Sequence, residues 1–401
     1  MKILIINKYW YPRGGADVYA IWLAWELKRR GHEVVVFSVK HPKNLHPEGA
    51  YRFISSVETE RLNPLAAPKT ISRMLWSREA ADQLAAFIKT ERPDVAHLHN
   101  IYTQMSPSIL PVLKKYGVPT TITIHDYGIT SANYSLFDDK GIDRIGSFGT
   151  VIRRRGVKRS FIASVIASTV FEFHKRFGVY EKNIDRMIFT TDYVRMLFKV
   201  RGWKGDKGTV VPYVVNLGKE GLKPQADDGF IFFAGRLHKT KGVHILIEAA
   251  RKTGLPIKIA GDGPDRKALQ KQAGAMTNIE FLGSIPRKTV LDYMRRARMV
   301  VVPSVWLEPF GLVALEPQGL GTPVIASKIG GLSEVLVHGQ TGLYVEPEDV
   351  QGLAAAMQRL WDDPEEARRM GKLGKRRFKS NYSVDQHMKK IMAVYEELVS
   401  K

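Results

Sequence analysis

Cysteine is missing from this sequence of 401 residues. Its absence excludes a disulfide framework, a zinc site built on cysteine, an iron–sulfur cluster and a cysteine nucleophile. Long hydrophobic runs are missing too. The first apolar segment, Ile3–Ile6, is shorter than the roughly 7–15 apolar residues of a signal peptide, and no window approaches the roughly 20 of a membrane-spanning helix. We therefore expect a cytoplasmic protein.

Acidic residues are scarce relative to basic ones. Asp and Glu number 40 against 61 Lys and Arg, so the formal net charge is +21. A charge of this size favours a polyanionic neighbour, which could be nucleic acid, an anionic membrane or a phosphorylated substrate. The 44% of hydrophobic residues suffices for an ordinary globular core, and the length suggests two domains or one large one.

Short apolar segments alternate with helix-like patterns along the chain. After the first segment, Val18, Ile21, Trp22 and Trp25 recur at spacings of three and four, which predicts an amphipathic helix. Strand, helix and strand at this spacing form a βαβ unit, so the sheet should be parallel. The expected strands are Ile3–Ile6, Val34–Phe37, Val95–His99, Thr120–His125, Met187–Thr190 and a segment near Thr209–Val211, and then Phe230–Ala234, Ile257–Ala260, Ile279–Leu282, Met299–Val302, Pro323–Ala326 and Gly342–Val345.

The strands fall into two sets, separated by a polar stretch over Gly218–Gly229 that we take as the linker. We therefore expect an α/β protein with two doubly wound, Rossmann-like domains facing each other across a cleft. The expected bounds are 1–217 for the first domain, 218–383 for the second and 384–401 for a last helix. In such domains, ligands bind beyond the carboxyl ends of the strands.

A basic segment, Ala234–Gly242, follows a strand of the second domain and opens a helix. Arg236 and Lys241 therefore leave the carboxyl edge of the sheet beside a helix N-terminus, as binding of a diphosphate would require. We expect both side chains to face solvent until a ligand binds. The alternative is a solvated basic loop, and the position at the ligand-binding edge favours the functional interpretation.

Two carboxylates follow a later strand of the same domain. Glu308 lies in the loop after Met299–Val302, and Glu316 lies in a helix that starts near Gly311. Ionised carboxylates accept hydrogen bonds from sugar hydroxyls, and the amides of Gly311 and Leu312 could face a phosphate. Taken alone, the two carboxylates are more simply a turn residue and an exposed helix residue.

Three further features lie at strand ends. His125 ends a strand of the first domain and is either a structural histidine or a residue of the ligand edge, and we take His97 and His99 as structural. Gly14 and Gly15 follow the first strand but lack the other glycines of the dinucleotide fingerprint, which argues against a classical dehydrogenase. Gly261–Pro264 is either a turn or a place of close backbone approach to a ligand.

Together, these segments resemble the retaining glycosyltransferases of family 4, which have the GT-B fold and include the glycogen-synthase and phosphatidylinositol-mannosyltransferase group. The resemblance covers most of the chain. It is carried by Gly14-Gly15, His125-Asp126, Ala234-Gly235-Arg236, Lys241-Gly242, Gly261–Pro264, Glu308, Glu316, Gly321–Ala326 and Gly330–Glu334.

The resemblance implies a role for each of these residues. Arg236 and Lys241, with Gly235 beside them, would bind the diphosphate of a nucleotide-sugar, and Glu316 would bind its ribose. Glu308 and His125 would face the donor sugar. The remaining donor-site residues would be Gly15, Gly311 and Leu312 at the phosphates, and Gly261 and Ile285 beside the base. The last helix would cross back onto the first domain.

The activity implied is retaining, metal-independent transfer from a UDP- or GDP-sugar to a hydroxyl of a glycan or lipid-linked acceptor, in cell-surface polysaccharide or glycolipid synthesis. It needs no cofactor. Two alternatives stay open. The charge suggests a non-enzymatic nucleic-acid-binding protein, although the basic residues are spread widely and no RNA-binding motif is present, so no nucleic acid is expected. A nucleotide-sugar epimerase of similar fold is the other; a phosphorylase would need a pyridoxal-binding lysine, which we do not identify.

Residues 153–173 suggest a membrane partner. Five cations between Arg153 and Arg159 precede an apolar stretch, Phe161–Phe173. A helix with a basic edge and an apolar face can lie in a lipid interface, which predicts peripheral attachment to the inner face of the cell membrane. The alternative is that Phe161, Val165 and their neighbours cover the core of the first domain.

Overall fold

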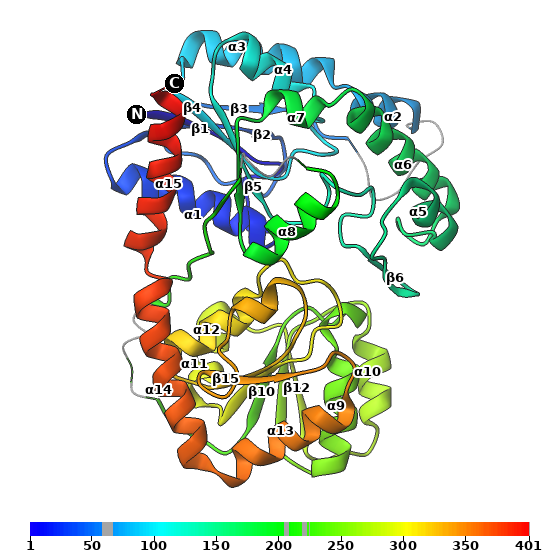
Figure 1. Cartoon of the computed structure of the whole chain (residues 1–401), viewed down its shortest axis with the longest axis vertical. Helices are drawn as coiled ribbons and strands as arrows, with labels where there is room; N and C mark the ends of the chain where they lie inside the picture. The colour runs from blue at the N-terminus through cyan, green and yellow to red at the C-terminus, as the bar shows by residue number, and fades with distance from the viewer. Residues whose placement is uncertain (58–66, 204–207, 219–222, 224, 401) are drawn as a thin grey trace. The chain divides into compact units, whose positions relative to one another are not determined.

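The computed structural model describes residues 1–57, 67–203, 208–218, 223 and 225–400 (Figure 1). The chain forms two compact units. Unit 1 comprises Met1–Thr190, Arg195–Val211 and Lys390–Lys401, and unit 2 comprises Thr191–Val194 and Pro212–Lys389. The expected linker, Gly218–Gly229, lies in part outside the described residues, at 219–222 and 224.

Unit 1 contains a parallel sheet in the order β3-β2-β1-β4-β5-β8-β9. The chain turns one way from β1 and the other way from β4, so the topological switch point lies between these two strands, where such sheets bind ligands. The strands are β1 (Lys2–Ile6), β2 (Glu33–Val39), β3 (Tyr51–Ile54), β4 (Val95–Leu98), β5 (Thr120–Ile124), β8 (Arg186–Phe189) and β9 (Gly208–Val210).

The helices of unit 1 alternate with its strands, except in an insertion between β5 and β8 that also holds the hairpin β6 (Phe137–Asp138) and β7 (Gly141–Ile142). The helices are α1 (Gly15–Arg29), α2 (Ala67–Leu75), α3 (Arg78–Glu91), α4 (Ile109–Lys115), α5 (Phe148–Arg154), α6 (Phe161–Arg176), α7 (Val179–Asn183) and α8 (Asp192–Val200), whose first residues belong to unit 2.

Unit 2 contains a second parallel sheet, in the order β12-β11-β10-β13-β14-β15, with its switch point between β10 and β13. Its strands are β10 (Ile231–Ala234), β11 (Ile257–Ala260), β12 (Ile279–Gly283), β13 (Met299–Val302), β14 (Val324–Ser327) and β15 (Gly342–Val345). Its helices are η3 (Lys239–Lys241), α9 (Val243–Thr253), α10 (Arg266–Ala273), α11 (Arg287–Arg296), α12 (Leu312–Leu320), η4 (Gly330–Glu334), α13 (Val350–Asp362) and α14 (Pro364–Asn381).

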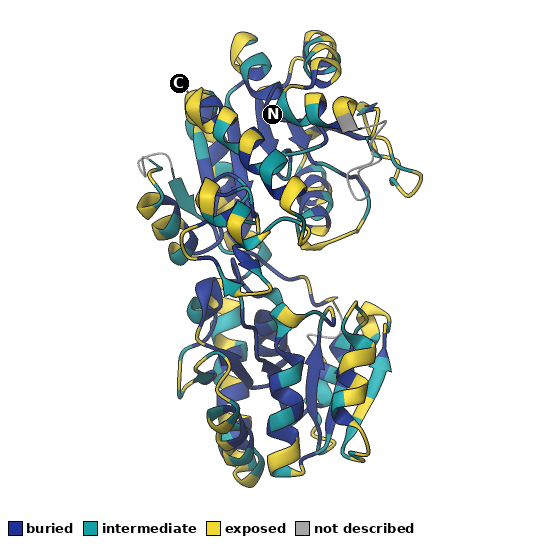
Figure 2. Ribbon diagram, turned by 90° about the vertical axis from the view of Figure 1, so that its right-hand side faces the viewer, coloured by how far each residue is buried: buried dark blue, intermediate teal, exposed yellow. Residues whose placement is uncertain are grey.

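The central strands are buried on both faces, as Figure 2 shows by their dark colour. Every residue of Ile3–Ile6 and of Met299–Val301 is fully buried. Continuous apolar strands of this kind are typical of parallel sheets with helices on both sides. The two doubly wound α/β domains predicted from the alternation are therefore confirmed.

The last helix, α15 (Val384–Val399), starts in unit 2 and ends in unit 1, as the resemblance implies. In unit 1 its fully buried Tyr395 is hydrogen-bonded to Nδ1 of His97 in β4, with 2.6 Å between the oxygen and the nitrogen. Nearby, Arg186 of β8 forms an ion pair with Glu397. The helix is thereby fixed to the sheet of unit 1 by polar as well as apolar contacts.

Helix α1 buries a different face from the apolar stripe that predicts it. Val18 and Trp25 of that stripe are 50% and 55% exposed, whereas Leu23 and Leu27 are fully buried. The buried face is hard to recognise because it also carries a paired polar residue: Glu26 accepts hydrogen bonds from the two arginines that follow it. The helix is confirmed, but its apolar stripe is not the core-facing side.

No helix in the described ranges is long and apolar enough to span a bilayer. The structure also contains elements that the sequence does not predict, among them β3, α2 and α8. The burial pattern explains why β3 is not predicted. The first two of its four residues are exposed, so this edge strand lacks the continuous apolar run of its neighbours.

Candidate functional site

Lys241 and Glu308 meet at the switch point of unit 2. Lys241 ends η3 in the segment after β10, and Glu308 lies in the loop after β13. The Lys241 ammonium donates a hydrogen bond to Oε1 of Glu308, and the hydroxyl of Ser304 donates to the same oxygen over 3.0 Å. Glu308 is only 6% exposed. The expectation that the Lys241 side chain faces solvent is therefore wrong, because this carboxylate holds it.

The ring of Trp306 gives Lys241 a second contact. The ammonium lies 5.3 Å from the ring centroid, which is within the range of a cation–π interaction. The indole Nε1 of Trp306 is buried and, among the described residues, has no hydrogen-bond partner. The sequence does not predict a role for Trp306, since nothing in its spacing distinguishes it from a core aromatic residue.

Close backbone contacts fix the position of these loops. A Cβ atom on Gly242, whose φ is +69°, would lie 1.7 Å from the carbonyl oxygen of Pro303. A Cβ atom on Gly330 would lie 2.6 Å from the carbonyl oxygen of Glu308, and that same oxygen accepts a hydrogen bond from the amide of Gly331. Gly242 and Gly330 are needed for backbone packing. This packing explains why glycine occupies these motif positions, and no ligand contact has to be invoked.

Arg236 extends from the turn that follows β10. Its side chain is exposed and, within the described part of the chain, forms no ion pair. Behind it, Gly235 and Gly261 pack backbone to backbone: Gly261 has φ +139°, and a Cβ there would lie 1.8 Å from the oxygen of Gly235. The close backbone approach expected at Gly261 is thus made to Gly235, at the end of the neighbouring strand β10.

Glu316 lies in α12 and is 6% exposed, so it is not the exposed helix residue of the simpler interpretation. Nη2 of Arg287 lies 2.8 Å from its Oε1. Burial raises the pKa of the Glu316 carboxyl, and Arg287 opposes this rise. Arg287 begins α11 just after the half-buried Ile285, so this ion pair links the predicted ribose carboxylate to the loop predicted to flank the base.

The N-terminus of α12 lies in the same set of loops. Gly311 is its N-cap residue, with φ +102°, and Leu312 is its first helical residue. The first amides of a helix have no partner within the helix and carry the positive end of its dipole. The predicted donor residues of unit 2 therefore all follow the carboxyl ends of four neighbouring strands, β10 to β13.

Unit 1 has a corresponding group at the ends of β1, β4 and β5. His125 is half-buried after β5, and its Nε2 lies 2.9 Å from Nδ1 of the fully buried His99. Burial lowers the pKa of His125 to about 3 and that of His99 well below its ordinary value, so both rings are neutral at pH 7. Burial also raises the pKa of Asp126 to about 6.

Gly15 is the first residue of α1, and a Cβ atom on it would have no neighbour within 4 Å. The space beside this helix N-terminus is therefore open. Two residues on, Asp17 is buried and accepts a hydrogen bond from the side chain of Asn7 over 2.9 Å. The sequence does not predict this pair, because the spacing of Asn7 and Asp17 does not distinguish them from other loop and helix residues.

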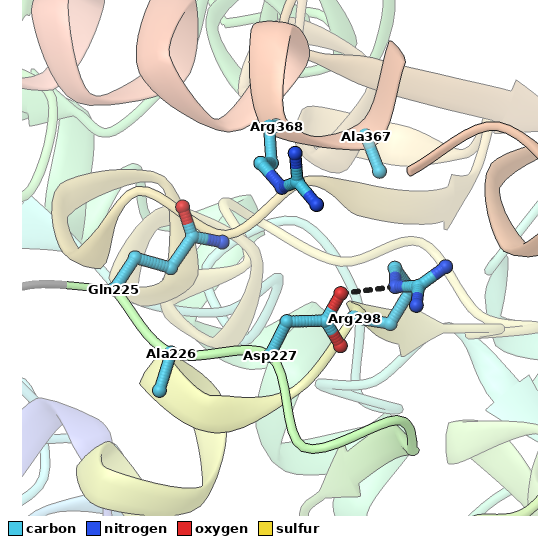
Figure 3. Close-up of a pocket in the computed structure, with 6 residues that line it drawn as sticks. All are labelled: Gln225, Ala226, Asp227, Arg298, Ala367 and Arg368. Carbon is cyan, nitrogen blue, oxygen red and sulfur yellow. Dashed lines mark hydrogen bonds and ion pairs between the residues drawn. The ribbon is translucent and has the colours of Figure 1, made fainter. Parts of the chain in front are cut away.

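A pocket of unit 2 lies elsewhere (Figure 3). Asp227 and Arg298 form an ion pair in it, and Arg298 comes directly before β13. The pocket is therefore at the amino end of that strand, opposite the edge where parallel sheets bind ligands. Its lining residues are Gln225, Ala226, Asp227, Arg298, Ala367 and Arg368.

Acidic and histidine side chains do not gather into a metal site in the described residues, where no three of them are placed to hold an ion. The groups that the structure does bring together are Lys241 with Glu308, Gly235 with Gly261, and His99 with His125. Within the described ranges, no ion pair joins Arg236 to Glu308 or Glu316.

A sequence profile described as "Glycosyltransferase Family 4" matches residues 13–219, which is more than half of the chain. The chain belongs to glycosyltransferase family 4. A second profile, "Glycosyl transferases group 1", matches residues 218–377 of this glycosyltransferase. The family assignment made from the motifs is therefore confirmed.

Relatives of this family 4 glycosyltransferase are similar over most of their length. An uncharacterized glycosyltransferase of Methanocaldococcus jannaschii is 28% identical over 90% of either chain. The glycogen synthase of Mycobacterium tuberculosis is 29% identical over 95% of this chain and 91% of its own.

Solved structures agree on the GT-B fold. Sucrose-phosphate synthase from Thermosynechococcus elongatus has a TM-score of 0.75 at 22% identity, covering 100% of this chain and 99% of that one. An Anabaena protein in complex with UDP has a TM-score of 0.70 at 17% identity, covering 99% and 100%.

Proposed function

We propose that this glycosyltransferase moves a sugar from a nucleoside-diphosphate sugar to a hydroxyl of a glycan or lipid-linked acceptor, with retention at the anomeric carbon. The biological setting we propose is cell-surface polysaccharide or glycolipid synthesis. The observation that supports the donor site best is the Lys241–Glu308 pair, because an ammonium and a buried carboxylate converge there at the ligand edge of unit 2.

The donor's diphosphate would bind to positive groups of unit 2. Arg236 offers an exposed guanidinium, Lys241 an ammonium, and the N-terminus of α12 at Gly311 and Leu312 its amides. A guanidinium group can donate two parallel hydrogen bonds to one phosphate, and helix N-termini favour anions. These groups can stabilise the charge that develops on the leaving diphosphate, which is why we propose that no metal ion is required.

The nucleoside would occupy the neighbouring strand ends. Glu316, held by Arg287, would accept hydrogen bonds from the ribose hydroxyls. Ile285 and Gly261 would flank the base, with Gly235 between Gly261 and the phosphates. The Anabaena structure contains UDP, which makes UDP the first nucleotide to test and GDP the second.

The sugar would be held by Glu308 of unit 2 and His125 of unit 1, and Gly15 would let the backbone approach the phosphate and the acceptor. We propose front-face displacement. The bond between the anomeric carbon and the diphosphate oxygen breaks, the acceptor oxygen bonds to the same face of that carbon, and its proton passes to the leaving diphosphate. The protein then contributes positioning and charge stabilisation.

Calorimetry with UDP, GDP and ADP tests the donor site. One of the three should bind and should stabilise the protein by about 2.7 kcal/mol at 100 times its dissociation constant. If none binds, the proposal is wrong. The protein is then incubated with sugars linked to the nucleoside diphosphate that binds, with and without a glycan acceptor. This separates a transferase from an epimerase, since an epimerase converts its substrate without an acceptor.

We propose that unit 1 attaches to an anionic membrane surface through a basic–apolar patch, Arg153, Arg155, Phe161 and Ile162. Helices α5 and α6, which carry most of it, pack against each other. Phe161 and Ile162 are 55% and 69% exposed, although a core-facing role was the alternative. Exposed apolar groups beside cations match the interface of a bilayer with anionic lipids.

The patch has fewer available cations than the sequence suggests. Arg154 turns inward and binds the carboxylate of Asp138 through two hydrogen bonds of 2.6 and 2.8 Å. Arg159 forms an exposed ion pair with Asp139. Both arginines are therefore left out of the patch.

A further inference from the structure

Three histidines lie in a row beneath the ligand edge of unit 1. His97 is in β4, His99 directly follows that strand and His125 follows the neighbouring strand β5. The rings of His97 and His99 are stacked, with centroids 4.5 Å apart and 25° between their planes. His125 is the residue of this row to which we assign contact with the donor sugar, so the following inference rests on the proposed function.

His97 anchors the row. Its Nδ1 is hydrogen-bonded to the hydroxyl of Tyr395 over 2.6 Å, and its Nε2 to the hydroxyl of Thr123 over 2.7 Å. Both of its ring nitrogens are thus engaged, one by α15 and one by β5. The stacked ring of His99 is held against a side chain that cannot turn.

Within the described part of the chain, His99 has a hydrogen bond on one nitrogen only. Its Nδ1 lies 2.9 Å from Nε2 of His125. Its Nε2 is buried and has no hydrogen-bond partner among the residues that the structure describes. The Tyr19 ring makes T-shaped contacts with both imidazoles, with centroids 5.7 Å from His99 and 5.6 Å from His125.

The unpaired nitrogen determines which ring donates the shared proton. A neutral imidazole has one donor nitrogen and one acceptor nitrogen. If His125 donated to His99, then His99 would carry its own proton on Nε2, a buried N–H without an acceptor. If His99 donates, only a lone pair is left unpaired, and buried donors without a partner are the rarer defect in proteins.

We propose that His99 is a positioning residue that donates through Nδ1 to Nε2 of His125 and thereby keeps the proton of His125 on Nδ1. His125 then meets the substrate as a hydrogen-bond donor. It stabilises an oxygen of the donor and does not remove the proton of the acceptor hydroxyl. That proton must go elsewhere, which agrees with its transfer to the leaving diphosphate.

Nitrogen-15 spectra of the full chain, with ring-labelled histidine, test the tautomer directly. The protein has 11 histidines, so a His125→Asn variant identifies the signals of this ring. At pH 7 we expect an Nδ1-protonated, neutral His125. A neutral His125 protonated on Nε2 would overturn the proposal. This measurement uses the unaltered protein and needs no turnover, so it stands even if the proposed transferase activity fails.

Two variants at position 99 test the consequence. An asparagine amide can donate from about the place of Nδ1, whereas an aspartate there can only accept. We expect His99→Asn to keep kcat within about tenfold of wild type, and His99→Asp to move the proton of His125 to Nε2 and lower kcat about 10²-fold with donor affinity unchanged. Equal kcat in the two variants would contradict the proposal, as would an unchanged His125 spectrum in His99→Asp.

Discussion

The ammonium of Lys241 is hydrogen-bonded to the carboxylate of Glu308, and the pair bridges the two loops on either side of the switch point of unit 2. Replacing a buried ion pair by apolar residues is often neutral or stabilising, so such a pair is weak evidence for a role in stability. At the ligand edge of a parallel sheet, the same pair supplies both signs of charge that a phosphorylated sugar needs. We therefore interpret it as part of the donor site.

The first prediction separates the two roles of this pair. Lys241→Met should leave the Glu308 carboxylate buried with Ser304 as its one remaining donor among the described residues, and lower the free energy of unfolding by about 3 kcal/mol. The double variant Lys241→Met, Glu308→Gln should recover most of that stability but no turnover. Urea unfolding and a transfer assay measure the two quantities. Wild-type turnover in either variant would show that the pair is structural.

The second prediction concerns Arg236. Because its side chain is exposed and has no ion pair among the described residues, Arg236→Ala should change the unfolding free energy by less than about 0.5 kcal/mol. Turnover should fall about 10²-fold, since a donor to the leaving group is lost. Lys252→Ala, which removes an exposed cation at the far end of α9, is the matched control and should keep full activity. Equal losses in both variants would indicate a general charge effect.

The third prediction uses the burial of Glu316. Burial raises the pKa of the Glu316 carboxyl in the folded state above the ordinary value of 4.5, which applies to the unfolded state. At a pH between these two pKa values, the carboxyl is protonated in the folded state and ionised in the unfolded state. Stability therefore falls as the pH rises through that interval. Glu316→Gln should remove this fall and raise the unfolding free energy at pH 7 by about 0.5–2 kcal/mol, because the exposed Arg287 remains hydrated. A less stable variant at pH 7 would contradict this.

The fourth prediction distinguishes the two carboxylates by ligand. Glu316→Gln should weaken binding of the free nucleoside diphosphate about tenfold, because a charged acceptor of the ribose hydroxyls is lost. Glu308→Gln should leave that affinity at or above the wild-type value, since Lys241 is released from its partner, and should lower sugar transfer about 10²-fold. Calorimetry and a transfer assay on both variants decide. The reverse pattern would mean that the two roles are exchanged.

The fold could be predicted where residue pattern and burial coincide. Central strands such as β1, β10 and β13 are continuous apolar runs that are buried on both faces, so the sequence predicts their bounds to within one residue. Helix α1 shows the limit. Its buried face includes the paired Glu26, while Trp25 faces solvent, so hydrophobicity alone marks the wrong side. Edge strand β3 was missed because half of it is exposed.

The site residues could be proposed from sequence, but their partners could not. The spacing of Glu308 and Glu316 and the basic segment after β10 carry the family resemblance. Nothing in the sequence shows that Lys241 pairs with Glu308, that Arg287 holds Glu316, or that His99 touches His125. Each of these contacts joins residues from different loops, brought together only when the strands are placed side by side.

The last prediction concerns the basic–apolar patch of unit 1. Each Lys or Arg near an anionic leaflet contributes about 1 kcal/mol, so its two cations give a weak, salt-sensitive attraction, and the exposed side chains of Phe161 and Ile162 add the apolar part. Wild-type protein should therefore sediment with vesicles that contain anionic lipid at low salt, and less with neutral vesicles. Phe161→Ser with Ile162→Ser should reduce this binding. The matched control is Met196→Ser with Val200→Ser, which removes two apolar side chains of α8 that are at least as exposed, and it should leave binding unchanged. If wild type stays in solution, or both double variants bind as it does, unit 1 does not attach to membranes through this patch, and a soluble acceptor becomes the better proposal.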